Sequence, residues 1–317
     1  MKESSPSAKF KPSKFQQQSQ YQKSGFISPL QILTREETKK LHTQFISWQK
    51  SLPEQKVSGN LRFKPHLYLP FINRLVHHPT IVETVSSILD TTNILLWSSD
   101  FNIKEAHTDG FYALHQDGTY TGLKPSELGV TVWLAITDPV DELHGCMTYI
   151  EESHIFGQLP HMEATANDGE DGNQITAGIG GNNNNMLSRG QKVILSEDEQ
   201  AQLKWKPVLA SLRGGEASLH HFHLLHKSGP NKGNQPRIGL ALRYISGTVR
   251  QTGSTREMVT LVKGKMEHNG FDLEPILPLN EEDVLNIHMD VGRKVHKEAM
   301  ERESMNYFDS SENQNYL

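Results

Sequence analysis

The chain has 317 residues, 35% of them hydrophobic and 22% charged, and a formal net charge of −5. This length fits one large domain, and the apolar content suffices for a core. The acidic balance, without any basic stripe interleaved with aromatic residues, argues against a nucleic-acid partner.

Two features bear on where the protein works. Cys146 is the only cysteine, so an intrachain disulfide and a zinc knuckle are excluded, which is typical of a reducing compartment. No run approaches the roughly 18 apolar residues of a membrane span. Residues 1–24 are rich in Lys, Ser and Gln and lack the apolar segment of a secretory signal. We expect a disordered tail there, with a targeting peptide as the alternative, and a cytoplasmic protein.

Helical patterns come first along the chain. Thr34 and Glu37 form a capping box before apolar residues at helical spacing, which predicts a helix over 35–50. An apolar stripe behind Pro79 predicts a second helix from 79 to about 89. Such helices commonly cover one face of a β-barrel. From 93 to 137, β-branched and aromatic runs punctuated by glycines predict strands.

The second half returns to strands after an irregular stretch. Residues 165–190 are rich in Gly and Asn without apolar periodicity, which predicts either a lid or a surface insertion. A short capped helix is predicted over 196–203, further strands over 211–244, and a last helix from 280 toward 301. The resulting organisation is a tail over 1–24, a single domain over 25–275, and a C-terminal helix and tail over 276–317.

Metal-ligating residue types recur at two places. His115 and Asp117 stand at i and i+2, and on a strand such residues point the same way, so both can reach one ion. A second imidazole from His226 would complete a 2-His-1-carboxylate set. That set leaves about three octahedral positions open, as non-heme Fe(II) oxygenases need for a bidentate cosubstrate and O₂. Arg237, eleven positions after His226, can bind a carboxylate through two parallel hydrogen bonds.

The residues alone leave the choice of the second histidine open. Four histidines, His220, His221, His223 and His226, stand within seven positions. If this stretch is one strand, His220 and His226 share a side and the other two point away. The three that are not ligands are expected to be hydrogen-bond partners, substrate contacts or packed imidazoles.

The residues alone also leave open which arginine binds the carboxylate of the cosubstrate, because Arg237 and Arg243 share a side of one strand. We call the arginine with this role the clamp. The arginine that is not the clamp is expected to form a structural ion pair. A charged cluster around Lys104 and Glu105 is expected to be a solvated loop. The alternative is that it lines the barrel mouth and selects a cationic substrate.

At these motifs the sequence resembles the phytanoyl-CoA dioxygenase family of Fe(II)/2-oxoglutarate enzymes, from about residue 25 to residue 250. The matching stretches keep the family order: Leu114-His115-Gln116-Asp117, Gly129 to Ala135, Gly145-Cys146-Met147 with Ser153-His154, His226 to Asn231, and Arg237 to Tyr244. The resemblance implies a mainly β fold with flanking helices, a double-stranded β-helix (jelly-roll, cupin-like) barrel packed against N-terminal helices.

The resemblance also assigns roles to residues. It implies three iron ligands, His115, Asp117 and His226. For the cosubstrate it implies that Arg237 and Ser228 grip the distal carboxylate and that Trp133 and Gln116 line the binding site, with plain core packing as the alternative for Trp133.

The implied activity is an Fe(II)- and 2-oxoglutarate-dependent dioxygenase. It would hydroxylate an aliphatic C–H bond of a small-molecule or acyl substrate with O₂, release succinate and CO₂, and use ascorbate as a supporting reductant. One alternative is a non-catalytic metal-binding sensor or binding module. Another is a halogenase-type relative, which Asp117 disfavours because such enzymes carry Gly or Ala in place of the ligand carboxylate. No sequence feature indicates an oligomeric state.

Overall fold

The computed structural model describes residues 13–52, 54–163, 184–187, 191–252, 256–268 and 270–274. The helices are α1 (Lys14–Ser24), α2 (Arg35–Ser51), α3 (Pro70–Val76), α4 (Pro79–Ile88) and α5 (Glu197–Gln202). The strands are β1 (Phe26–Gln31), β2 (Ile94–Lys104), β3 (Tyr112–His115), β4 (Leu123–Lys124), β5 (Gly129–Ala135), β6 (Met147–Ile150), β7 (His161–Glu163), β8 (Gln191–Val193), β9 (Pro207–Ala210), β10 (Glu216–His221), β11 (His226–Ser228), β12 (Arg237–Ser246), β13 (Arg250–Gln251), β14 (Met258–Lys263) and β15 (Asp272–Leu273).

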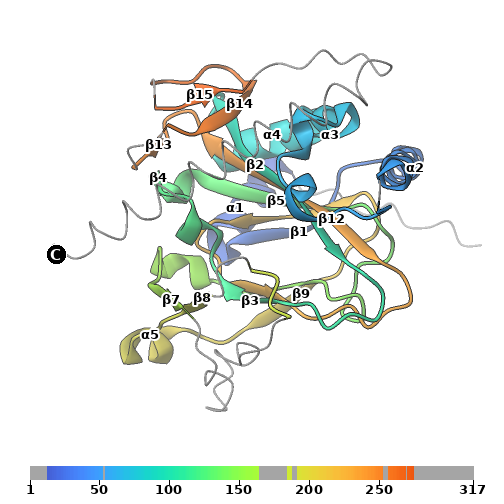
Figure 1. Ribbon diagram of the computed structural model, residues 1–317. Coiled ribbons are helices and arrows are strands. Elements are labelled where there is room, and N and C mark those ends of the chain that lie inside the picture. The colour runs from blue at the N-terminus through green and yellow to red at the C-terminus, as the bar shows by residue number, and fades with distance from the viewer. Residues whose placement is uncertain are drawn as a thin grey trace, which may run out of the picture.

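Two antiparallel sheets form the body of the protein. The large sheet has seven strands in the order β1-β10-β5-β12-β2-β14-β15, and only its β14–β15 pair is parallel. The small sheet has four strands in the order β3-β11-β6-β9. The helices α3 and α4 lie along one side of the large sheet, and β3 and β9 lie on the other (Figure 1).

The two faces of the large sheet differ because side chains alternate along each strand. On the outer face, apolar residues such as Val132 and Leu240 pack against helix residues such as Phe45, Ile72 and Val85. On the inner face, the large and small sheets meet in a smaller apolar cluster that includes Trp133, Ala241 and Tyr149 from facing strands. The interior between the sheets is therefore partly polar, and it is where the motif residues lie.

A bulge in β2 sets which of its residues face inward. Arg243 pairs with Ser98 and Tyr244 pairs with Leu96, so Trp97 has no partner on β12. Beyond the bulge, Phe101 packs in the outer cluster, whereas Asp100 contacts Arg243 on the inner face. A bulge of this kind adds one residue to a strand and so shifts its alternation.

Most predicted elements are confirmed. The helices predicted over 35–50, 79–89 and 196–203 correspond to α2, α4 and α5, and α2 and α5 carry the capping boxes of Thr34 and Ser196. The predicted strand regions hold β2, β3 and β5, and later β10, β11 and β12. The predicted helix from 280 to 301, and the loop over 165–190 apart from residues 184–187, lie outside the described residues.

The N-terminal segment differs from its prediction. A disordered tail was expected over 1–24, but Lys14–Ser24 forms α1. Ser13 and Gln16 make a capping box, Tyr21 is buried, and Gly25 ends the helix in the left-handed conformation that favours glycine. Residues 1–12 lie outside the described part. Among the helices that the structure describes, none is long and apolar enough to cross a membrane.

Candidate metal centre

Three motif residues converge between the sheets. His115 ends β3, His226 begins β11, and the two are direct partners in the small sheet. Asp117 stands two residues after His115, at the start of the 3-10 turn Asp117–Tyr120. All three are buried, and their ligand atoms lie within 4.8 Å of one another. We call these three residues the triad. The i, i+2 argument placed the pair correctly, although the strand ends at His115 and Asp117 lies in the turn beyond it.

Both imidazoles have their ligand nitrogen free. The Nδ1 atoms of His115 and His226 lie 2.7 and 2.9 Å from the carbonyls of Ala113 and Leu224, so each Nδ1 donates and each Nε2 keeps its lone pair. Burial lowers the pKa of both rings. The two histidines are therefore neutral at ordinary pH, as a metal ligand must be.

Asp117 is held by three donors. Thr131 Oγ1 donates to Oδ2 at 2.5 Å, His220 Nε2 lies 3.1 Å from the same oxygen, and Arg243 Nη2 donates to Oδ1 at 3.3 Å. Burial opposes ionisation of this carboxyl, but Arg243 and then His220 hold its pKa well below the usual value. The carboxylate is thus charged and fixed in orientation.

Strand register explains why these three donors meet. His220 of β10 pairs with Thr131 of β5, and Thr131 pairs with Arg243 of β12, so the three form one row across the inner face. Arg243 also pairs with Asp100, so its guanidinium joins two carboxylates. Arg243 therefore makes the structural ion pair expected of one of the two arginines. No sequence pattern shows this row, because it depends on the pairing of three separate strands.

The histidine-rich stretch is not one strand. β10 ends at His221, a turn follows, and β11 begins at His226 in the other sheet. His220 contacts Asp117 and, through Nδ1 at 3.1 Å, the Tyr149 hydroxyl. His223 instead contacts Ser126. The side-chain alternation of a single strand therefore does not apply here, and His220 is a hydrogen-bond partner of Asp117, as expected for one of the other histidines.

A second group lies beside the triad and consists of Lys104, Trp133, Ser228 and Arg237; we call it the Arg237 cluster. Arg237 stacks over the Trp133 ring at 5.1 Å and donates to the carbonyls of Gly145 at 2.7 Å and Asn102 at 3.5 Å. Its Nε is buried without a hydrogen-bond partner. An unsatisfied buried donor on a cation marks a place for an anion.

Trp133 owes its position to Gly239. The indole Nε1 donates to Asn102 Oδ1 at 2.9 Å, and the ring covers Gly239, where an added Cβ would lie 2.0 Å from Trp133 Cζ2. Trp133 is therefore both packed in the inner cluster and in contact with Arg237. The core packing weighed for Trp133 is confirmed, and its role in lining a cosubstrate site stays a prediction.

Lys104 differs from its prediction. A solvated loop was expected around it, but Lys104 ends β2 directly opposite Arg237 and is only 1% exposed. Its Nζ donates to Ser228 Oγ at 2.6 Å, to the Ser228 carbonyl at 3.2 Å and to the Gly229 carbonyl. The sequence does not reveal the bulge in β2, and the bulge decides that the Lys104 side chain points to the inner face of the sheet.

Gln116 has a different environment from the other residues that the resemblance assigns to the cosubstrate. Its amide nitrogen donates to the carbonyls of Gly157 and His223 at 2.8 and 2.6 Å, and its oxygen accepts from Leu159 N at 2.8 Å. The side chain therefore fastens the segment after β6 to the turn between β10 and β11. None of these hydrogen bonds joins Gln116 to a residue of the Arg237 cluster.

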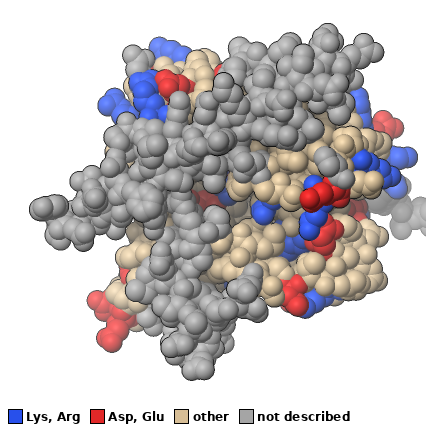
Figure 2. Space-filling view, in the orientation of Figure 1, with Lys and Arg blue, Asp and Glu red and all other residues tan. Residues whose placement is uncertain are grey.

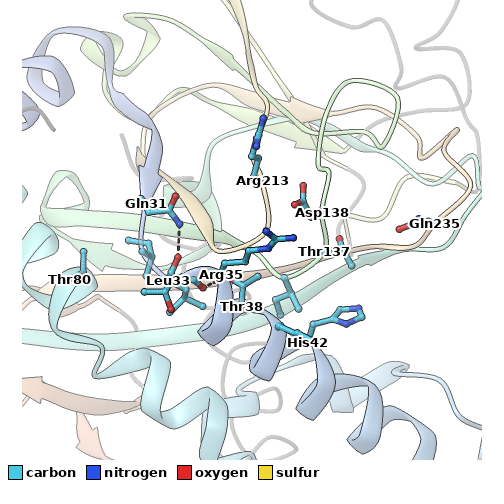
Figure 3. Close-up of a pocket in the computed structure, with 15 residues that line it drawn as sticks. Gln31, Leu33, Arg35, Thr38, His42, Thr80, Thr137, Asp138, Arg213 and Gln235 are labelled. Atoms are coloured by element: carbon cyan, nitrogen blue, oxygen red, sulfur yellow. Dashed lines mark hydrogen bonds between the residues drawn. The ribbon is translucent and has the colours of Figure 1, made fainter. Parts of the chain in front are cut away.

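A separate pocket of about 850 Å³ opens elsewhere, between the start of α2 and the ends of β1 and β5. Arg35 and His42 of α2, Asp138 and Arg213 are among its lining residues (Figure 3). No triad residue lines it. On the face shown in Figure 2, basic and acidic side chains are interspersed.

The two facing sheets around a buried His-Asp-His triad define the jelly-roll class of non-heme iron oxygenases. Within this class, the model of the phytanoyl-CoA dioxygenase (PhyH) family matches residues 21–239, and the chain belongs to that family. The family and fold class expected from the sequence are confirmed. They support the general reaction class of 2-oxoglutarate-dependent chemistry at a non-heme iron.

Comparisons with individual proteins agree with this family and fold. A Danio rerio "Phytanoyl-CoA dioxygenase domain-containing protein 1" is 27% identical over 114 residues, which is 36% of this chain and only 38% of that protein. The structure of a "non-heme monooxygenase; ThoJ apo" is 25% identical with a TM-score of 0.71 and covers 94% of this chain and 99% of its own. A structure named "CytC3 with Fe(II) and alpha-ketoglutarate" shares the fold at 19% identity, with a TM-score of 0.56 over 84% of this chain and 93% of its own.

Proposed function

We propose that this protein is an Fe(II)- and 2-oxoglutarate-dependent dioxygenase that hydroxylates an aliphatic C–H bond of a small-molecule or acyl substrate and releases succinate and CO₂. The observation that carries the proposal is the juxtaposition of two groups in one buried interior. The first is a triad with a free lone pair on each imidazole, and the second is a cationic cluster with an unsatisfied donor.

The residues present fit the two groups that this activity needs. Two neutral imidazoles and one ionised carboxylate suit Fe(II) and leave about three positions of an octahedral ion open. Arg237 and Ser228 suit the distal carboxylate of 2-oxoglutarate, since one offers a buried guanidinium and the other a buried hydroxyl. Bound together, iron, 2-oxoglutarate and O₂ supply the oxidant for the C–H bond, with ascorbate keeping the iron ferrous.

The chain's own residues have three tasks. The row of His220, Thr131 and Arg243 fixes the carboxylate of Asp117, and the Ala113 and Leu224 carbonyls fix the two imidazoles. The apolar cluster around Trp133 and Tyr149 keeps water from the interior. The Arg237 cluster orients the cosubstrate. Precise orientation of ligands and cosubstrate is what lets a substrate carbon be oxidised selectively.

Uncoupled turnover tests the proposal. The protein with ferrous iron, ascorbate and O₂ should convert 2-oxoglutarate to succinate slowly without substrate, and omission of iron should stop the conversion. A protein that binds metal but forms no succinate would support the binding-module alternative. A halogenase-type relative is disfavoured because the carboxylate of Asp117 occupies the ligand position.

Substrate and location need separate experiments. Incubation of a metabolite extract with protein, iron, ascorbate and 2-oxoglutarate, followed by product profiling, would identify what is hydroxylated. We also propose a cytoplasmic location, because the free cysteine Cys146 and a ferrous centre both suit a reducing compartment. Cell fractionation tests it.

A further inference from the structure

Two buried cations face each other in the Arg237 cluster. Lys104 and Arg237 are direct partners on the antiparallel strands β2 and β12, and each is 1% exposed. Their hydrogen bonds go to backbone carbonyls and to the Ser228 hydroxyl. Within the described part of the chain, neither forms an ion pair with a carboxylate.

Other cations in the described interior have acidic partners. Lys64 lies 2.6 Å from Glu274, and Arg243 joins Asp100 and Asp117. A buried charge without a counter-charge is costly, and like charges directly opposite each other on a sheet add to the cost. Burial, and then the charge of Arg237, lowers the pKa of Lys104 to about 6. Beside Arg237 alone, Lys104 is therefore largely neutral at neutral pH, and an anion bound beside Arg237 would favour its positively charged form.

The geometry at Ser228 shows how Lys104 can serve such an anion. All three Nζ hydrogens of Lys104 have oxygen partners, one of which is Ser228 Oγ at 2.6 Å. Since this oxygen accepts from the ammonium, the hydrogen of the Ser228 hydroxyl remains available to donate. Lys104 thus fixes Ser228 as a donor and adds a positive charge beside Arg237.

Resting on the proposed function, we infer that Lys104 is a positioning residue for the distal carboxylate of 2-oxoglutarate. It orients the Ser228 hydroxyl toward that carboxylate and supplies the second positive charge, so that the site selects a dicarboxylate over a 2-oxo monocarboxylate. Among the described residues, no Asp or Glu side chain hydrogen-bonds to Lys104 or Arg237, so the cosubstrate itself is the counter-charge.

Calorimetric titration of the full chain loaded with Mn(II) tests the inference. The two probes are 2-oxoglutarate and 2-oxovalerate, which has a methyl group in place of the distal carboxylate. Lys104→Met keeps an unbranched side chain up to the ε position and removes the ammonium group. It should weaken 2-oxoglutarate binding by at least roughly tenfold and change 2-oxovalerate binding by less than about twofold, because only the first ligand carries the second charge.

Ser228→Ala should show the same ligand selectivity. If Lys104 acts through Ser228, the double variant should bind 2-oxoglutarate little more weakly than the poorer single variant, since effects within one hydrogen-bonded unit are not additive. The matched control is Lys64→Met. Lys64 is also a buried lysine, but it bonds to Glu274 and the Met258 carbonyl and not to the Arg237 cluster. This control should lower thermal stability and leave the ratio of the two affinities unchanged. Lys104→Gln serves if the methionine variant does not fold.

The outcomes separate this inference from the proposed function. If the wild type binds 2-oxoglutarate and Arg237→Ala impairs it, but Lys104→Met has no effect or weakens both ligands equally, Lys104 has only a structural role and the inference falls. If the wild type binds neither ligand with metal present, the proposed function falls as well.

Discussion

At the scale of single residues, the two inner arginines of β12 have different kinds of partner. Arg243 forms ion pairs with Asp100 and Asp117, whereas Arg237 contacts, among the described residues, two backbone carbonyls and the Trp133 ring. A guanidinium that is already paired with two carboxylates has few free N–H groups and no uncompensated charge with which to bind a third carboxylate. These contacts support the choice of Arg237 as the clamp, which the sequence alone left open.

Arg237→Ala should raise the apparent KM for 2-oxoglutarate by roughly thirtyfold or more, since losing a buried charged partner costs about 2 to 5 kcal/mol. Affinity for ferrous iron should stay near the wild-type value. Arg237→Lys should recover part of the loss, because an ammonium lacks the planar fork. Titration of 2-oxoglutarate at saturating iron measures both. An unchanged KM here, beside a large rise in Arg243→Ala, would move the clamp to Arg243.

His115→Ala and His226→Ala should each abolish iron-dependent succinate formation, because a site with two ligands holds Fe(II) weakly. Neither variant should unfold without metal, since the apolar clusters that hold the sheets together contain neither histidine. Succinate assay, metal stoichiometry and thermal melting check the three statements. Full activity in either variant would refute the triad.

At the scale of elements, glycines decide how closely strands and side chains approach. Gly239 of β12 lies under the Trp133 ring, so any Cβ there must displace the indole from Asn102 and Arg237. Gly229 lies just after β11, and a Cβ added to it would meet no atom within 4 Å. Both glycines lie beside the Arg237 cluster, and only Gly229 has room for a Cβ.

Gly239→Ala should therefore destabilise the protein by about 1 to 3 kcal/mol, as overpacking usually does, and also weaken 2-oxoglutarate binding. Gly229→Ala is the matched control and should change neither quantity appreciably. Chemical denaturation and ligand titration measure the effects. Equal stability of the two variants would mean that the Trp133 ring can relocate without cost.

At the scale of the whole molecule, the described C-terminal end is fastened by a buried charge cluster. Glu274, beyond β15, bonds to Lys64 at 2.6 Å and to His66 at 3.0 Å, both of which precede α3. Burial would raise the pKa of Glu274, but Lys64 and His66 lower it to about 2. The cluster links two segments that lie far apart in the sequence.

This cluster predicts a particular acid sensitivity. Because the folded pKa of Glu274 lies below its ordinary value of 4.5, its contribution to stability is complete above pH 4.5 and is lost as the pH falls toward about 2. Glu274→Gln should be less stable near neutral pH by about 3 to 5 kcal/mol, since it leaves Lys64 buried without a partner. The difference in unfolding free energy between wild type and variant should shrink from pH 5 to pH 2; a constant difference would refute the assignment.

The sequence predicted what depends on local spacing. The helices α2 and α5 follow from their capping boxes, and His115 with Asp117 follows from adjacency. α1 was missed because its sequence is mostly polar, and its support from Tyr21 and Gly25 comes from the folded chain.

Strand register could not be predicted, and much of the site depends on it. Lys104 meets Arg237, and His220 meets Thr131 and Arg243, only through pairings between strands distant in sequence. The turn that separates His220 from His226 likewise has no strong local signal. The three residues of the triad could therefore be proposed from their motif, whereas most residues that hold them in place could not.

Because Trp97 has no partner on β12, the side-chain alternation of β2 shifts by one residue at this point. Before it, Leu96 joins the helix-facing core; after it, Phe101 does so, while Asp100, Asn102 and Lys104 reach the interior. Deleting one residue at this point would rotate the second half by one side-chain step, turning three polar residues into the helix-packed core and Phe101 into the interior. A single extra residue in β2 thus keeps Asp100, Asn102 and Lys104, which contact Arg243, Trp133 and Ser228, on the same side of the sheet as the triad.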